Sequence, residues 1–250
     1  MSRLFDSPEM ALGYARSRPP MHAPILELVR EHLKLNAPVA EALDVGCGAG
    51  LSTAPLAAIA KHRTGVEPFE SMLRHASAIA PGADFTVGQA EALPVRSESI
   101  DLCTAAGSLP FTDVPYALVE LRRVLRRGGT LVIYDFRQGC DFRDNDRLTM
   151  WHAEFKRRYP PPPSKGFDVE ALPLAANGFY LAAYRPFEIG LTLSPDFYLN
   201  YAMTETNVAA ATARGIAEQE IRTWCRESLA GVFGGEPREV VFKGYAAYAV

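Results

Sequence analysis

Glycine and acidic residues with a regular spacing stand out in the first third of the chain. Gly46, Gly48 and Gly50 lie directly after the apolar run 39–45 and before a run with helical spacing. Glycines between a strand and a helix let the backbone approach a ligand that a Cβ atom would exclude. The spacing is GxGxG, whereas the dinucleotide-binding fingerprint GxGxxG requires glycine at the position of Leu51. The turn therefore indicates a ligand site and argues against a nicotinamide-dependent oxidoreductase.

An acidic side chain ends the second expected strand. Glu67 in Gly65-Val66-Glu67-Pro68 adjoins the glycine-rich turn and could accept hydrogen bonds from vicinal ribose hydroxyls. The alternative is a surface glutamate, but the position at a strand end favours a binding role. Met72, one helical turn later, is expected either near a ribose or in the core.

The elements that position these residues alternate between strands and helices. Such alternation predicts a parallel sheet covered on both faces. Beyond Phe136 the regular alternation of strands and helices ends, and the four prolines 160–163 exclude a helix there. We expect strands at 39–45, 64–67, 84–87, 100–106, 130–136, 179–193 and 240–249, and helices at 51–62, 69–79, 114–125, 143–159 and 217–232.

Several motifs together resemble the class I S-adenosylmethionine-dependent methyltransferases. Leu43-Asp44-Val45 before the glycine-rich turn is similar to the family's first motif, in which the glycine backbone lies against the amino-acid half of the cofactor. The segment 88–94 resembles G-D-A-E-x-L-P, with Gln89 in place of the acid that usually accepts a bond from the adenine amino group. The side chain of Glu91 is expected to have a structural role instead. The stretches 99–106 and 126–131 resemble the F-D-L-V strand and the L-R-P-G-G-x-L turn.

The N-terminal segment resembles one branch of this family. Residues 14–19 are similar to the Y-x-x-x-R-P element of the branch that contains trans-aconitate methyltransferases, where the segment covers the cofactor. The resemblance therefore implies that Tyr14 and Arg18 face the cofactor's carboxylate, although Arg18 on an exposed leading helix is the alternative. The cofactor-binding residues implied by the resemblance and by the strand-end argument are Tyr14, Arg18, Asp44, Gly46, Cys47, Gly48, Gly50, Glu67, Pro68, Met72, Gln89, Ala90, Glu91 and Ala105.

The expected fold class is α/β. The resemblance implies a Rossmann-like, doubly wound and mostly parallel seven-stranded sheet, with an antiparallel C-terminal strand and an inserted lid after the fifth strand. Residues 1–250 are expected to form a single domain. Within it, 1–36 would form helices that cover the cofactor, and 137–180 would form a lid over the acceptor pocket.

The implied activity is methyl transfer from S-adenosylmethionine to an O, N or C atom of a small molecule, which leaves S-adenosylhomocysteine as product. Positioning alone supplies much of the rate in such an in-line displacement, so no catalytic dyad is required. Candidates for a base are Asp135, Tyr134, His22 and His152, and candidates for contact with a small aromatic or carboxylated acceptor are Trp151, Tyr198 and Tyr201.

Composition narrows the possible partners. The 250 residues include 26 Lys and Arg against 29 Asp and Glu, so the net charge is −3 and does not favour a nucleic-acid partner. The chain has no apolar run of membrane-spanning length, and its cysteines have no metal-ligand spacing. We therefore expect a cytoplasmic monomer or homodimer with free thiols and no metal. A non-catalytic cofactor-binding module and an RNA or protein methyltransferase remain the alternatives.

Overall fold

The computed structural model describes residues 17–163 and 166–250, and its centre is a mixed β-sheet. The strand order is β3-β2-β1-β4-β5-β8-β6, and β7 pairs with β8. The first five strands run parallel, whereas β8 runs antiparallel to β5, β6 and β7. The strands are β1 (Val39–Val45), β2 (Ala60–Glu67), β3 (Asp84–Val87), β4 (Ile100–Ala106), β5 (Leu125–Phe136), β6 (Asp141–Phe142), β7 (Leu181–Leu193) and β8 (Arg238–Ala249).

This architecture confirms the expected α/β fold class, with an eighth strand, β6, of only two residues added to the seven expected. The helices are α2 (His22–His32), α3 (Glu70–Ile79), α4 (Val114–Val124), α5 (Arg147–Arg158), α6 (Pro195–Ala202), α7 (Thr206–Ala213) and α8 (Glu218–Phe233). Short 3-10 turns are η2 (Ala54–Ala58), η3 (Leu109–Phe111) and η4 (Ala175–Asn177).

The two faces of the sheet are covered because side chains alternate along each strand. Tyr134 of β5 joins a cluster with Ile25 and Val29 of α2 on one face. Ile133 joins a cluster with Leu118 and other residues of α4 on the opposite face. The doubly covered sheet follows from this alternation of apolar residues.

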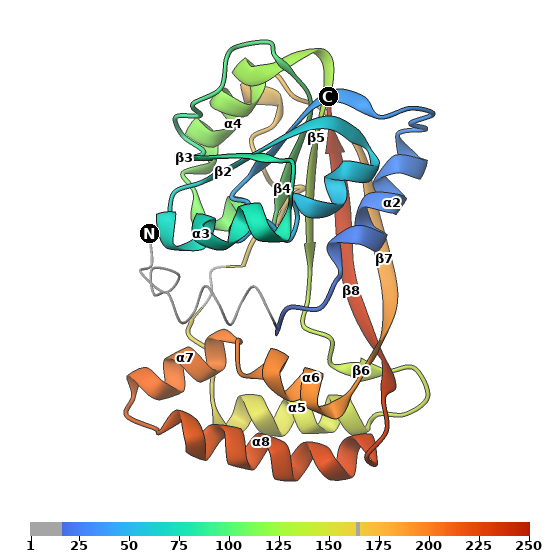
Figure 1. The fold of residues 1–250 in the computed structure, drawn as a ribbon, viewed down its shortest axis with the longest axis vertical. Helices are drawn as coiled ribbons and strands as arrows, with labels where there is room; N and C mark the ends of the chain where they lie inside the picture. The colour runs from blue at the N-terminus through green and yellow to red at the C-terminus, as the bar shows by residue number, and fades with distance from the viewer. Residues whose placement is uncertain (1–16, 164–165) are drawn as a thin grey trace.

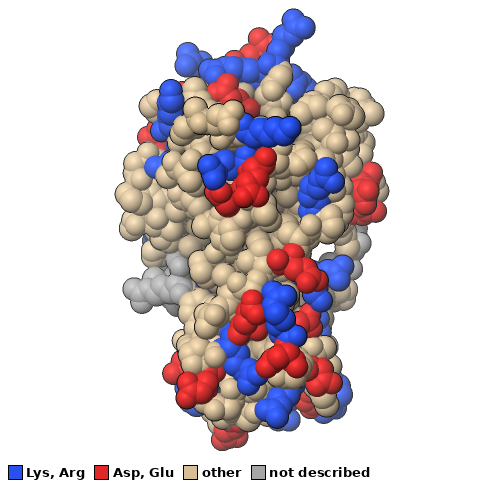
Figure 2. Space-filling view, turned by 90° about the vertical axis from the view of Figure 1, so that its right-hand side faces the viewer, with Lys and Arg blue, Asp and Glu red and all other residues tan. Residues whose placement is uncertain are grey.

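Helices α5 to α8 form a separate layer at the lower end of the molecule, beyond the long strands β7 and β8 (Figure 1). The core of this layer contains Trp151, Phe155 and Leu229, and it is continuous with the core between the sheet and α2. The layer extends to Phe233, well past the segment 137–180 that the sequence indicated as a lid. Figure 2 shows acidic and basic side chains intermixed over the visible face of this layer.

The prediction of a helix at 51–62 is wrong. Residues 51–53 form a turn, η2 follows, and β2 already begins at Ala60. Pro55 has no amide hydrogen and therefore cannot donate the hydrogen bond to the Leu51 carbonyl that an α-helix starting at residue 51 would require. The hydroxyls of Ser52 and Thr53 donate to Asp44, which further fixes the turn.

Other element boundaries also differ from the prediction. Helices α6 and α7 lie in the stretch 194–216, to which the sequence analysis assigned no element, and α6 begins where the Ser194 hydroxyl accepts a hydrogen bond from the Phe197 amide at 3.1 Å. Strand β5 begins at Leu125 rather than 130, across an irregularity in its pairing with β4. Helix α5 begins at Arg147, four residues later than expected. None of the helices in the described ranges has both the length and the apolar character needed to cross a bilayer.

Candidate functional site

A cavity opens at the carboxyl ends of the parallel strands. Its walls include Val45–Gly48 after β1, Glu67–Phe69 after β2, and Ala106–Ser108 after β4. The space measures about 970 Å³ when its opening to solvent is included. Ligands of open α/β sheets bind at this edge. The cavity is therefore the candidate functional site.

The glycine-rich turn contributes bare backbone to this cavity. Gly46 has φ +71°, and a Cβ atom there would lie 2.3 Å from the Cβ atom of Ser108. A Cβ atom on Gly48 would lie 3.2 Å from the Met72 methyl carbon. Gly50 differs, because a Cβ atom there would lie 3.2 Å from the Ala76 backbone and the residue is absent from the cavity wall. Gly46 and Gly48 thus form the part of the turn that a ligand could contact.

Asp44 lies beneath the turn instead of in the cavity. Its side chain is fully buried and accepts hydrogen bonds from the hydroxyls of Ser52 (2.6 Å), Thr53 (2.7 Å) and Thr104 (2.9 Å). Burial raises the pKa of the Asp44 carboxyl, and the three hydroxyl donors oppose that rise. Asp44, which the family resemblance indicated as a cofactor-binding residue, therefore stabilises the glycine-rich turn from its buried side.

Glu67 connects the turn to the end of β2. One carboxylate oxygen accepts from the Gly48 amide at 3.0 Å, and the other accepts from the Phe69 amide at 3.2 Å. The residue is 7% exposed, and desolvation raises the pKa of its carboxyl. An ionised carboxylate has about four lone-pair sites, so both oxygens can accept a further hydrogen bond from a ligand.

The loop after β3 places Glu91, not Gln89, on the cavity wall. Gln89 is exposed and forms a short bridge with Ala92 outside the cavity. Ala90 and Glu91 line the wall. The Oε1 atom of Glu91 accepts from the Asp113 amide at 2.6 Å, immediately before α4.

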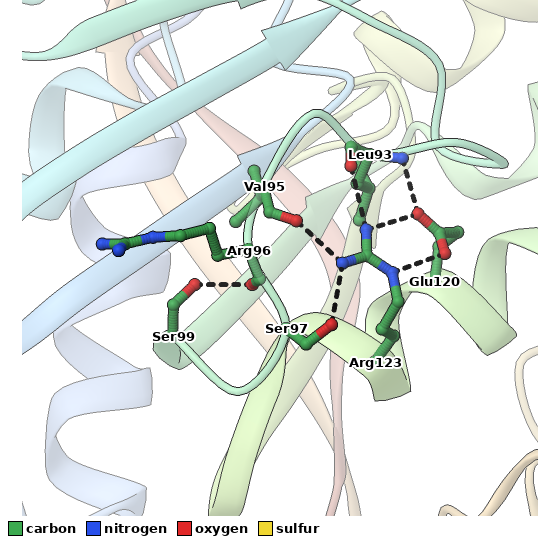
Figure 3. Close-up of polar contacts among 7 residues, drawn as sticks. All are labelled: Leu93, Val95, Arg96, Ser97, Ser99, Glu120 and Arg123. Carbon is green, nitrogen blue, oxygen red and sulfur yellow. Dashed lines mark hydrogen bonds and ion pairs between the residues drawn. The ribbon is translucent and has the colours of Figure 1, made fainter.

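Two side chains of α4 hold the downstream part of this loop (Figure 3). The Arg123 guanidinium donates to the carbonyl oxygens of Leu93 (2.9 Å) and Val95 (2.8 Å). The Glu120 carboxylate accepts from the Leu93 amide at 2.8 Å and pairs with Arg123 at 2.6 Å. The loop that carries Ala90 and Glu91 is therefore fixed to α4 on both sides of Ala92.

Histidine 22 is the candidate base that lines the cavity. Its Nδ1 atom lies 3.0 Å from the Tyr134 hydroxyl, and burial together with the nearby Arg18 charge lowers its pKa to about 4. Asp135 lies behind Gly107, with Oδ1 3.1 Å from the place a Gly107 Cβ would occupy, and burial raises the pKa of its carboxyl. His152 is buried in the helical layer, where its pKa is lowered to about 4.

Five other predicted site residues that the structure describes lie outside the cavity wall. The Arg18 guanidinium forms an ion pair with Glu205 at 3.2 Å and lies 5.6 Å from the Tyr201 ring centroid. Ala105 is buried in the core of the sheet. Trp151, Tyr198 and Tyr201 belong to the buried core of the helical layer, and Tyr14 lies outside the described residues.

Sequence reasoning missed several residues that line the cavity. Ser108 donates its hydroxyl proton to the Val45 carbonyl at 2.6 Å, which ties the loop after β4 to the end of β1. The strand-end rule could have identified this loop, because the carboxyl ends of β1 and β4 are neighbours. The missed wall residues include Val45, Leu51, Ser52, Phe69, Gly88, Ser108, Phe111 and Thr112.

Comparison with known proteins places this site within a known family. Residues 43–133 match the model of the methyltransferase domain. The chain is 26% identical over 178 residues to a ubiquinone biosynthesis O-methyltransferase of Rhizobium rhizogenes, covering 64% of this chain and 70% of that protein. It is 36% identical over 108 residues to a malonyl-[acyl-carrier protein] O-methyltransferase of Methylococcus capsulatus, covering 41% and 39% of the two chains.

The similarity extends to the whole fold of one solved structure. A protein from Anaeromyxobacter dehalogenans, provisionally assigned as a type II methyltransferase, aligns with a TM-score of 0.70 and 25% identity over 89% of this chain and 94% of that one. The chain spans about half the length, 39–51%, of most of the curated relatives that it matches. The domain match coincides with the strands and loops that build the cavity. The chain therefore contains a methyltransferase domain and has the fold of the class I S-adenosylmethionine-dependent methyltransferases.

Proposed function

We propose that this protein transfers the methyl group of S-adenosylmethionine to a small-molecule acceptor. The observation that carries the proposal is the contact between the Gly48 amide and the Glu67 carboxylate at 3.0 Å on the wall of one cavity. This contact joins glycine backbone on the cavity wall to an acidic side chain at a strand end. A binding site for S-adenosylmethionine requires both features. Both lie within the matched segment 43–133.

The residues present fit this cofactor. Gly46 and Gly48 line the cavity, and neither carries a side chain that would keep the backbone away from the amino-acid half of the molecule. Glu67 can accept hydrogen bonds from the ribose hydroxyls. When bound, S-adenosylmethionine would supply a methyl group on a positively charged sulfur. The protein's own contribution is to orient the two reactants and to exclude water.

The acceptor is proposed to approach from the side of His22, Ala106 and Gly107. Ala106 and Gly107 are small, so they leave room beside the cavity, and His22 with its pKa of about 4 is neutral near pH 7. This wall therefore favours an uncharged reacting group and offers the imidazole as a hydrogen-bonding partner. The ion pair between Arg18 and Glu205 connects this side to the helical layer, which we propose encloses the acceptor.

A small-molecule acceptor is favoured over RNA. The net charge is −3, and acidic and basic side chains alternate on the face shown in Figure 2. An RNA-binding face would concentrate Lys and Arg. Two relatives are named for ubiquinone biosynthesis and for malonyl-[acyl-carrier protein], so acceptors differ within the family. The relation to the trans-aconitate branch stays a prediction, because Tyr14 lies outside the described residues.

A thermal-shift comparison tests the cofactor, since a ligand selective for the folded state raises the melting temperature. We expect S-adenosylmethionine and S-adenosylhomocysteine to raise it and NAD to leave it unchanged. Stabilisation by NAD alone, or by none of the three, would overturn the proposal. Incubation with methyl-labelled cofactor and a panel of phenols, amines and carboxylates then tests turnover. Cofactor binding without label transfer to any acceptor would favour a non-catalytic binding module.

A further inference from the structure

His22 presents one ring nitrogen to the cavity. It is the first residue of α2 and lines the wall together with Ala106 and Gly107, where β4 ends. Its Nδ1 atom lies 3.0 Å from the Tyr134 hydroxyl, and within the part of the chain that the structure describes Nε2 has no hydrogen-bond partner. Because Nδ1 is already engaged, Nε2 is the nitrogen that can meet a ligand in the cavity.

The imidazole ring is oriented by two aromatic side chains of one strand. Tyr134 and Phe136 project from the same face of β5, two residues apart. Each ring meets the imidazole in an edge-to-face arrangement, with a centroid separation of 5.8 Å and interplanar angles of 66° and 72°. Tyr134 is 1% exposed, so the side chain that contacts Nδ1 is fixed within the core. A ring that is oriented before the ligand arrives suits a role that requires precise geometry.

The other titratable side chains described on the wall are placed less favourably for contact with an acceptor. Glu67 follows β2 and Glu91 follows β3, and β1 separates both strands from β4. Each of these carboxylates already accepts a backbone amide. Cys47 is 3% exposed, burial raises the pKa of its thiol, and Asp135 is not a residue of the wall. His22 is therefore the group of the described wall that can exchange a proton with an acceptor beside β4.

The imidazole is a free base at neutral pH. Burial, together with the charge of Arg18, lowers the pKa of His22 to about 4. Arg18 pairs with Glu205 at 3.2 Å, so the helical layer contributes to keeping this charge close to the ring. A neutral imidazole of such low basicity takes a proton efficiently from a group that becomes strongly acidic during the reaction.

Three classes of acceptor differ in whether they yield such a proton. A carboxylate brings no proton to the reaction. An amine attacks as its free base, and the ammonium ion that forms has a pKa well above that of this imidazole, so it keeps its protons. A hydroxyl that attacks as the neutral group becomes a protonated ether, which is a strong acid. Of the three classes, the hydroxyl matches the imidazole of His22.

We propose that the acceptor is a hydroxyl compound and that Nε2 of His22 receives its proton during methyl transfer. The inference rests on the proposed function, because it defines the acceptor of that reaction. The hydroxyl oxygen forms a bond to the methyl carbon while the carbon–sulfur bond breaks and its electron pair stays on sulfur. The proton moves to Nε2 and is released to solvent after the methyl ether leaves. Tyr134 is a positioning residue, because its oxygen can accept from the Nδ1–H group of the imidazolium.

Transfer of labelled methyl to three matched aromatic compounds, a phenol, a benzylamine and a benzoate, tests the inference. We expect label in the methyl ether of the phenol and in neither of the other two compounds. In His22→Gln, kcat for the phenol should fall about a hundredfold or more, as for loss of a general base, while calorimetry gives an unchanged affinity for S-adenosylhomocysteine. The loss should be smaller for a more acidic phenol that arrives ionised, because it brings no proton.

Tyr134→Phe keeps the ring and should lower kcat about threefold to tenfold, as expected for one hydrogen bond. His32→Gln, at the opposite end of α2, is the matched control and should leave kcat unchanged. Melting temperatures of all variants establish that they fold.

Four results would overturn the inference and leave the proposed function intact. They are label on an amine or a carboxylate instead of a hydroxyl, label on a ring carbon, an unchanged kcat in folded His22→Gln, and an equal loss in that variant for both phenols. Label on no acceptor would overturn the proposed methyl transfer itself.

Discussion

The amide of Gly48 donates to the carboxylate of Glu67 at 3.0 Å, and this contact couples the glycine-rich turn to the end of β2. One side chain therefore fixes the shape of the turn and also faces the cavity. Because Glu67 is 7% exposed, its carboxylate is partly desolvated, which strengthens hydrogen bonds to it. Ligand binding and the shape of the glycine-rich turn therefore both depend on the Glu67 carboxylate.

Replacement of Glu67 by glutamine should weaken S-adenosylhomocysteine binding by about tenfold or more, because a charge-assisted acceptor becomes neutral. Isothermal titration calorimetry measures the change. Glu70→Gln provides the control, since Glu70 is an exposed residue at the start of α3. Equal losses of affinity in the two variants would argue against a specific role for Glu67.

The glycine-rich turn should tolerate no side chain at its first glycine. In Gly46→Ala the new Cβ atom meets Ser108 at 2.3 Å and the residue must keep a positive φ, so we expect a loss of about 3 kcal/mol or more in unfolding free energy. Gly128→Ala separates the effect of the steric clash from the effect of the positive φ. Gly128 also has a positive φ but has no atom within 4 Å of its Cβ position, so its loss should be about 1 kcal/mol. Urea denaturation of both variants measures the difference, and equal losses would exclude the clash.

The contacts of α4 with the loop after β3 should support cofactor binding indirectly. Arg123→Ala removes hydrogen bonds to Leu93 and Val95 and leaves Glu120 unpaired, which should cost about 1–2 kcal/mol of stability because the ion pair is partly exposed. Cofactor affinity should fall as the loop loosens, while kcat with saturating cofactor changes little. Arg127→Ala, at an exposed position near the start of β5, should leave both properties unchanged. A drop in kcat alone would contradict this positioning role.

Stability should depend on pH through His22 and His152. The pKa of each is lowered from 6.5 to about 4 in the folded protein, so the unfolded chain binds more protons between these values. The contribution of both residues to the unfolding free energy therefore increases as pH rises from about 4 to 6.5. His22→Gln and His152→Gln should each flatten this dependence in urea titrations at several pH values. A slope that is identical in both variants and in the unaltered protein would contradict the burial of these imidazoles.

Much of the sheet could be predicted from the sequence, because apolar runs bounded by turns determine buried strands. The bounds of β3 and β4 agree with the prediction to the residue. The helix after the glycine-rich turn could not be predicted correctly from apolar spacing, since Pro55 and the hydroxyl contacts of Asp44 decide that stretch. Helices α6 and α7 carry little periodic signal and depend on packing in the helical layer.

The candidate site was predictable where it consists of backbone and strand ends, as at Gly46, Gly48 and Glu67. The site was less predictable where the direction of a side chain determines whether the residue faces the cavity. Gln89 and Glu91 are two residues apart, and the sequence alone does not tell which of them faces the cavity. Aromatic residues such as Trp151 have the same sequence signature in a core as in a ligand pocket. Their placement in the helical layer depends on contacts far apart in the chain.

A crystal structure of the complex with S-adenosylhomocysteine tests the central claim most directly. We expect the ribose hydroxyls to lie within hydrogen-bond distance of the Glu67 carboxylate and the amino-acid half to lie against the backbone of Gly46 and Gly48. A nucleoside bound elsewhere, or a Glu67 side chain turned away from it, would contradict the assignment of this cavity.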